Sequence, residues 1–296
     1  MARTKLSRRD FFAVGGGAAA AGLVGDRASA EDNEKKSTSR VVLIRDAGVL
    51  DGAGRPDAEI LHRMLNHGLA ELMGEKDSSS AWRKLFSPTD VVGIKSNVWG
   101  RLPTPPALEE AMRTELERVG VAPKNIAADD RNVKENPVFR RATALINTRP
   151  MRTHDWSGLG TCIKNLINFT EYYPAYHGDA CASLGSIWLR PELKGKVRLN
   201  VLVMLTPQFH TTGPHSYSRE FIWPYGGLIL GTDPVAVDAT GARIIEARRK
   251  LYFGDDRPIS PPPHHIQVAE TQYGIGVADP ERIEIARLGW QEDALI

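Results

Sequence analysis

Apolar runs and amphipathic segments alternate along most of the chain. Continuous apolar runs, which are typical of buried strands, cover residues 41–46, 90–98, 125–130, 142–148, 198–207 and 227–232, and an alternating run covers 281–288. Between them, helical spacing of apolar residues or a proline start predicts helices over 57–74, 106–119 and 233–250. We therefore expect an α/β fold, with a mainly parallel sheet covered by helices on both faces in a single large domain.

The first 30 residues differ from the rest and have the three regions of an export signal. The sequence SRRDFF at 7–12 is a twin-arginine pattern, a Gly/Ala-rich apolar stretch follows, and Ala-Ser-Ala at 28–30 is a cleavage site. We predict a twin-arginine signal peptide over 1–30, a disordered leader over 31–40 and the α/β domain over 41–296. The protein would be periplasmic or otherwise exported, with the twin-arginine machinery as a partner. Because the apolar stretch is short and glycine-rich, we expect no stable membrane anchor after cleavage.

Charge and cysteine content narrow the classes of partner and cofactor. Cleavage after Ala30 would remove five basic and two acidic residues and leave a nearly neutral chain, which gives no reason to expect nucleic acid as a partner. The two cysteines, Cys162 and Cys181, are too few to ligate an iron–sulfur cluster. They could form a disulfide in an oxidising compartment or remain buried thiols. Export in the folded state fits a metal or ligand loaded in the cytoplasm, and it equally fits a domain that folds quickly.

Two candidate groups follow predicted strands, at the edge where open α/β sheets bind ligands. Lys95 and Asn97 lie near the end of the run 90–98. The Lys95 ammonium could bind a carboxylate or phosphate, or it could instead extend to solvent. In the later sequence TPQFHTTGPHS, His210 and His215 flank a Gly-Pro turn. These imidazoles could bind a metal ion or transfer protons, or each could have an ordinary structural role.

The stretch 152–169, RTHDWSGLGTCIKNLINF, carries the densest set of candidates. His154 follows a strand, the chain turns at Gly160, and Thr161 would cap a helix with Lys164 in its first turn. Backbone amides at a helix start bind anions, whereas a lysine there opposes the helix dipole. Contact with a ligand could offset that cost. We therefore predict that His154 and Lys164 are catalytic and that Gly160 and Thr161 bind the ligand.

The helix start at 231–238, GTDPVAVD, contributes two carboxylates. Asp233 is a good N-cap and Pro234 fits the first helical position, so a structural role explains both. Asp238 lies one turn into the helix, where it could hold a lysine or metal ion or serve a local surface role.

At these residues the chain resembles the domain of unknown function 362 family. The shared motifs are Ile-Lys-x-Asn at 94–97, a Thr-His to Lys-Asn segment at 153–165, and Gly-x-Asp-Pro-Val-Ala-Val-Asp at 231–238. The resemblance implies a ligand site built from Lys95, Asn97, His154, Lys164, Asn165, Asp233 and Asp238. Many relatives carry a ferredoxin-like module, which this sequence lacks. Pro207 and Gln208 also stand where relatives have an acidic sequence, so that carboxylate role does not carry over. The resemblance to this family does not indicate which reaction, if any, the protein catalyses.

Three functions remain open at this point. The first is an exported enzyme that binds a small anionic or carbonyl-bearing molecule, with His154 transferring the proton. The second is a metal- or redox-linked protein that uses His154, His210, His215 and Asp238. The third is a periplasmic binding or accessory protein with the same ligand pocket and no proton transfer.

Overall fold

The computed structural model describes residues 37–211 and 216–296. The predicted signal peptide, most of the predicted leader and His215 lie outside the described residues. Among the described helices, none is long and apolar enough to cross a membrane.

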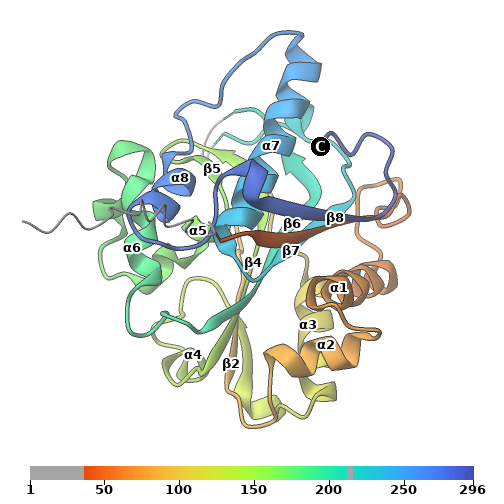
Figure 1. Cartoon of the computed structure of the whole chain (residues 1–296), viewed down its shortest axis with the longest axis vertical. Helices are drawn as coiled ribbons and strands as arrows, with labels where there is room; N and C mark the ends of the chain where they lie inside the picture. The colour runs from red at the N-terminus through yellow and green to blue at the C-terminus, as the bar shows by residue number, and fades with distance from the viewer. Residues whose placement is uncertain (1–36, 212–215) are drawn as a thin grey trace, which may run out of the picture. The chain divides into compact units, whose positions relative to one another are not determined.

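An eight-stranded mixed sheet forms the centre of the domain, in the order β3-β2-β4-β6-β7-β1-β8, with β5 paired to β4 (Figure 1). Most strands are parallel, and β7 runs antiparallel to both of its neighbours. This confirms the predicted α/β class. The strands are β1 (Ser39–Arg45), β2 (Val92–Lys95), β3 (Ile126–Asp129), β4 (Ala144–His154), β5 (Gly158–Gly160), β6 (Val197–Gln208), β7 (Gly227–Gly231) and β8 (Ile283–Gly289).

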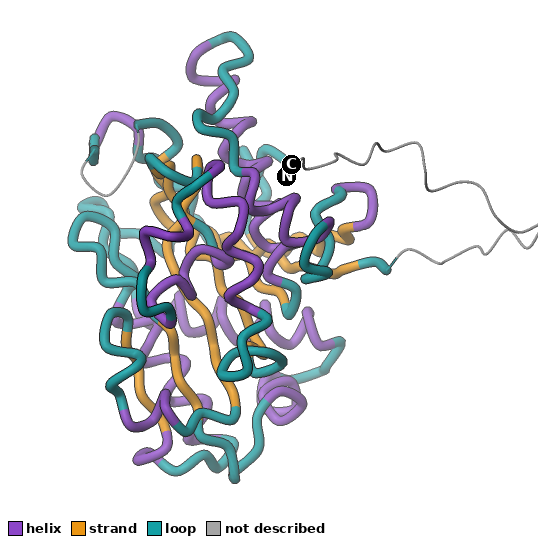
Figure 2. Tube along the Cα trace, turned by 90° about the vertical axis from the view of Figure 1, so that its left-hand side faces the viewer, coloured by secondary structure: helices purple, strands orange, loops and turns teal. Residues whose placement is uncertain are grey.

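Helices cover both faces of the sheet, as predicted. Figure 1 shows α1, α2 and α3 together on one side of the sheet and α5, α6 and α8 on the other, and Figure 2 shows the strands passing behind the helices of the second face. Alternate residues of β1 point to different cores: Val42 and Ile44 into the first, Val41 and Leu43 into the second. The helices are α1 (Ala58–Met73), α2 (Ser78–Leu85), α3 (Pro106–Arg118), α4 (Pro137–Arg140), α5 (Cys162–Asn165), α6 (Gly185–Trp188), α7 (Pro234–Phe253) and α8 (His264–Thr271).

The long helices begin and end where local sequence signals place them. The Asp57 side chain accepts a hydrogen bond from the amide of Ile60 at the start of α1, and Gly74 ends the helix in the left-handed conformation at φ 64°. Asp233 caps α7 in the same way, with Pro234 in the first turn.

Two elements differ from the expectation. The strand predicted over 142–148 continues to His154, so that Arg149 and Arg152 lie within a buried strand. The helix predicted after Thr161 is only the four-residue α5, followed by a 3-10 turn over Leu166–Phe169. The second half of this strand was not predicted because it contains two arginines, and arginines are normally exposed.

The register of the sheet brings several polar residues to one level. Lys95 at the end of the short β2 lies opposite Asn147, which is in the middle of β4. Asn147 lies opposite Asn200 of β6, and Asn200 lies opposite Gly231 at the end of β7. The start of α7 is therefore close to the middle of the sheet, which brings its side chains toward α5.

Candidate functional site

A buried chain of amide side chains holds α5 against the sheet. Nδ2 of Asn165 donates to Oδ1 of Asn147 at 2.8 Å and to the carbonyl of Thr148 at 3.1 Å. Asn147 in turn donates to Oδ1 of Asn200 at 3.0 Å. Oδ1 of Asn165 accepts from Nδ2 of Asn97 at 3.2 Å. These contacts give the predicted ligand residues Asn97 and Asn165 a role in positioning the loop that carries Lys164.

Lys95 is fully buried and paired within the protein. Its Nζ donates to Oδ1 of Asp130 at 2.5 Å and to the carbonyl of Ser96 at 2.7 Å. Burial lowers its pKa to about 8, against the opposing effect of Asp130. Asn168 donates to the same Asp130 oxygen at 3.0 Å and lines the cavity described below. Lys95 therefore lies behind the wall of that cavity rather than in it.

Asp238 occupies the helix start where we predicted an anionic ligand. It is fully buried, and its two carboxylate oxygens accept hydrogen bonds from the amides of Cys162 and Ile163, each at 2.8 Å. Burial raises its pKa to about 7. The prediction that these amides bind an external anion is therefore wrong, because a carboxylate from α7 already accepts their hydrogen bonds.

The neighbouring predicted ligand residues are also used inside the fold. The Thr161 side chain does not cap α5; its Oγ1 lies 3.0 Å from Nε2 of His265. Gly160 is buried against Arg149, and a Cβ at this position would lie 2.5 Å from the guanidinium. A side chain would therefore displace that arginine.

Asp233 likewise serves the fold rather than a ligand. Its Oδ1 accepts from the amides of Val235 and Ala236, and its Oδ2 accepts from the Ser39 hydroxyl and the amide of Val277. Both carboxylate oxygens are thus occupied at the start of α7, as the N-cap interpretation predicts.

His154 and Lys164 line one cavity of about 470 Å³, which we call the Lys164 cavity. Its other walls come from the β4–β5 turn, the loop after β3 and the turns after α5. The full lining is Arg131, Lys134, His154, Trp156, Lys164, Ile167, Asn168, Thr170, Glu171, Tyr173 and His177. The structure thus brings together the two residues predicted to be catalytic.

Lys164 is a buried cation without a carboxylate partner in the described residues. Only 4% of its surface is exposed, and its Nζ contacts Sγ of Cys181 at 3.6 Å. Burial lowers its pKa to about 8, and the positive charge of Arg149 acts in the same direction. A charge in this position is costly unless something compensates it.

His154 is held in its neutral form. Burial lowers its pKa far below the ordinary range, and the positive charges of Lys164, Arg149 and Arg152 lower it further. Nδ1 accepts a hydrogen bond from the amide of Trp156 at 3.3 Å, which assigns the proton to Nε2. The resting imidazole is therefore a hydrogen-bond donor.

Two buried arginines beside this cavity were missed in the sequence. Arg149 donates to the carbonyl of Thr161 at 3.3 Å, and burial lowers its pKa to about 10. Arg152 donates to Oδ1 of Asn97 at 3.2 Å and lies over the ring of Trp99 at 4.4 Å. Neither forms an ion pair with the described residues. The signal that could have found them is the sequence RPMR, which directly continues an apolar strand.

The described residues contain neither an assembled metal site nor a disulfide bond. No group of three His, Cys, Asp or Glu residues in 37–211 and 216–296 could hold a metal ion. Nδ1 of His210 lies 2.9 Å from a guanidinium nitrogen of Arg249, and burial and that cation lower its pKa. Cys162 and Cys181 are both buried free thiols.

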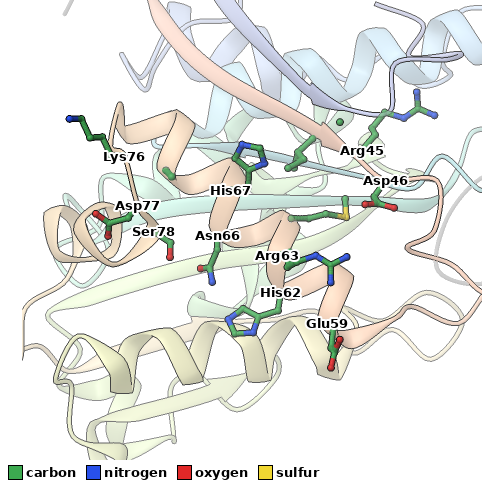
Figure 3. Close-up of a pocket in the computed structure, with 14 residues that line it drawn as sticks. Arg45, Asp46, Glu59, His62, Arg63, Asn66, His67, Lys76, Asp77 and Ser78 are labelled. Carbon is green, nitrogen blue, oxygen red and sulfur yellow. The ribbon is translucent and has the colours of Figure 1, made fainter.

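A larger cavity, of about 720 Å³, lies over α1, and we call it the α1 cavity (Figure 3). Among its charged residues, three cations stand beside three carboxylates: Arg45, Arg63 and Lys76, with Asp46, Glu59 and Asp77. In Figure 3, His62 and Asn66 point from α1 toward α3, where both contact the carboxylate of Glu115.

Comparison with known proteins finds one family that is similar to part of this chain, and it names no activity. The family described as a domain of unknown function (DUF362) matches residues 114–243. Over these residues, somewhat less than half of its length, the chain is similar to this family. No curated protein and no solved structure matches it.

The matched segment contains both the residues around α5 and the α7 carboxylate that contacts them. It runs from the end of α3 into α7, so it contains His154, Lys164 and Asn165 as well as Asp238. The matched region thus includes the Lys164 cavity residues and the carboxylate that caps α5, whereas Lys95 and Asn97 precede it.

Proposed function

We propose that this protein binds a small anionic molecule in the Lys164 cavity, with Lys164 as the principal anion-binding group. The observation that carries the proposal is that the Lys164 ammonium is buried against a cavity and has a thiol as its hydrogen-bonding partner. A bound anion would supply the missing compensation.

The surrounding charges favour an anion as well. Arg131 and Lys134 also line the cavity, and its one carboxylate, Glu171, already pairs with Lys134 at 2.9 Å. Arg149 and Arg152 add positive potential from behind the wall, because each lowers the pKa of both His154 and Lys164. The cavity is therefore positively charged although the whole chain is close to neutral.

His154 gives this binding site a route to proton transfer. Its neutral ring can donate a hydrogen bond from Nε2 to an anion or a carbonyl oxygen. Burial is the main cause of the low pKa of His154, and nearby cations lower it further. A bound anion would counter these cations, so the ring would be a better base when the site is filled. This arrangement supports the proposal of an enzyme that acts on an anionic or carbonyl-bearing substrate, and the predicted signal peptide adds the proposal that the enzyme is exported.

A non-catalytic binding or accessory protein is the second candidate function. The observation that favours it is the burial of His154 beside Lys164, because these surroundings lower the pKa of the ring and leave a weak base in the empty site. The variant His154→Gln separates the two functions: an enzyme keeps ligand binding and loses turnover, whereas a binding protein shows no turnover in either the parent or the variant.

Binding is tested by calorimetric titration with phosphate, sulfate, acetate and pyruvate. Lys164→Met keeps an unbranched side chain of similar size and removes the charge, and Lys194→Met is the matched control on an exposed loop. We expect the parent and the control to bind at least one probe equally and Lys164→Met to bind it at least tenfold more weakly, since a buried charged hydrogen bond is worth about 1.5–3 kcal/mol. Equal binding by Lys164→Met, or no binding of any anion by the parent, would overturn the proposal.

A further inference from the structure

We infer that the anion bound in the Lys164 cavity carries a planar ring, as in an aryl or heteroaryl phosphate or carboxylate. The inference rests on the proposed function and adds the class of ligand. Three features of the cavity support it: its volume, the aromatic side chains at its mouth and the position of His154 between these side chains and Lys164.

The volume exceeds what a bare anion needs. The cavity measures about 470 Å³, within the range of about 300–1,000 Å³ that holds whole cofactors or drug-sized molecules. Phosphate or acetate would occupy a small part of it. The remaining space adjoins aromatic side chains, so the rest of the ligand would contact rings.

Exposed aromatic side chains line the mouth. Trp156 is 44% exposed and Tyr173 is 57% exposed, and both line the cavity. The Trp156 indole stacks on the His177 imidazole, with centroids 4.2 Å apart and planes 19° apart. Tyr173 meets the same imidazole edge-on at 6.1 Å. The three rings form a continuous aromatic wall.

His177 belongs to this wall as an uncharged ring. Burial, together with the charge of Lys164, lowers its pKa to about 4. At neutral pH it is therefore a flat stacking surface that fixes Trp156, rather than another cation for the anion.

The aromatic wall and the anion-binding group meet at His154. The imidazole of His154 lies 5.6 Å from the indole of Trp156, and the same residue lines the cavity together with Lys164. A ligand held by Lys164 through its anionic group can thus place an attached ring against Trp156. Stacking of a ring on an aromatic side chain adds binding energy that a ring-free anion cannot obtain.

The test compares probes that differ only by a ring: phosphate with phenyl phosphate, and acetate with benzoate. The variant is Trp156→Ala, and the control is Tyr172→Ala, a residue that is 68% exposed, adjoins Tyr173 and does not line the cavity. We expect the ring to tighten binding about tenfold or more in the parent and in Tyr172→Ala. In Trp156→Ala that gain should fall to about threefold or less, with the ring-free probe bound within about twofold of the parent.

The outcomes separate the two proposals. If phosphate or acetate binds through Lys164 but the ring adds nothing, the ring inference is wrong and anion binding stands. If Trp156→Ala weakens both members of a pair equally, Trp156 maintains the cavity rather than contacting a ring, and the inference is again wrong. If no probe of either kind binds, both proposals fail. The pair that gains more from its ring identifies the anionic group as a phosphate or a carboxylate.

Discussion

The Lys164 cavity and the α1 cavity each adjoin a buried ionisable side chain, but the two side chains differ in how many partners stabilise their charge. Beside the α1 cavity, one oxygen of Glu115 accepts hydrogen bonds or ion pairs from His62 at 2.6 Å, Asn66 at 2.8 Å and Arg118 at 2.9 Å. Beside the Lys164 cavity, the one hydrogen-bonding partner of the Lys164 ammonium among residues 37–211 and 216–296 is the Cys181 thiol, at 3.6 Å. The larger cavity therefore has a compensated charge and the smaller one does not.

This difference teaches that charge balance identifies the candidate site better than cavity size. A folded protein tolerates a buried charge when nearby groups of the protein stabilise it, as they do at Glu115. Where such groups are lacking, the fold bears a cost that a ligand can remove on binding. The comparison makes predictions of opposite sign for the two regions.

The largest effect is expected at Glu115. Glu115→Ala would leave His62, Asn66 and Arg118 without their shared acceptor and create a cavity between α1 and α3. We expect the free energy of unfolding, measured by urea denaturation, to fall by about 3 to 5 kcal/mol. A loss below about 1 kcal/mol would show that this carboxylate is not the stabilising centre we describe.

Lys164→Met should change stability in the opposite direction. The pKa of Lys164 falls from an ordinary 10.5 to about 8, so its charged form costs the empty fold about 3 kcal/mol. We expect the ligand-free variant to be more stable than the parent by up to this amount in the same denaturation assay at pH 7. A less stable Lys164→Met would mean that the ammonium is compensated inside the protein and that the contrast with Glu115 is wrong.

The stability gained in Lys164→Met should depend on pH. Below about pH 8 the lysine is charged in both the folded and the unfolded chain, so the full cost is present. Between about pH 8 and 10.5 the folded lysine is neutral while the unfolded lysine still carries its proton. The stability of the parent therefore rises relative to the variant over this window. Paired urea titrations at pH 7, 9 and 10 should show the gap closing, and a constant gap would contradict the assignment to Lys164.

The smallest effects are expected within the α1 cavity. Arg63→Gln and His67→Gln replace exposed side chains that line it. We expect stability to change by no more than about 0.5 kcal/mol and anion affinity to stay within twofold of the parent. Loss of anion binding in either variant would move the candidate site to this cavity.

Local signals in the sequence were enough for most of the fold. Asp57 and Gly74 define the ends of α1 because a cap needs only the neighbouring amides and carbonyls. The apolar run that becomes β6 predicts a buried strand without knowledge of its partners. The same local reasoning found His154 and Lys164, which the structure places in one cavity.

The same reasoning failed where a long-range contact decides what a group does. The helix start at α5 has the local features of an anion site, but Asp238 from 76 residues later accepts its hydrogen bonds. The family resemblance groups Lys95 with Lys164, yet Asp130 compensates only Lys95. The predicted strand ended before Arg149 and Arg152, whereas the structure buries both residues within β4.

The sequence by itself determined the alternation of strands and helices, their caps and the similarity to the family over part of the chain. Tertiary structure alone decided which buried charges are compensated. The physical reason is range: periodicity and capping depend on residues within a few positions, whereas the cost of a buried charge depends on every group that folding brings within a few ångströms of it.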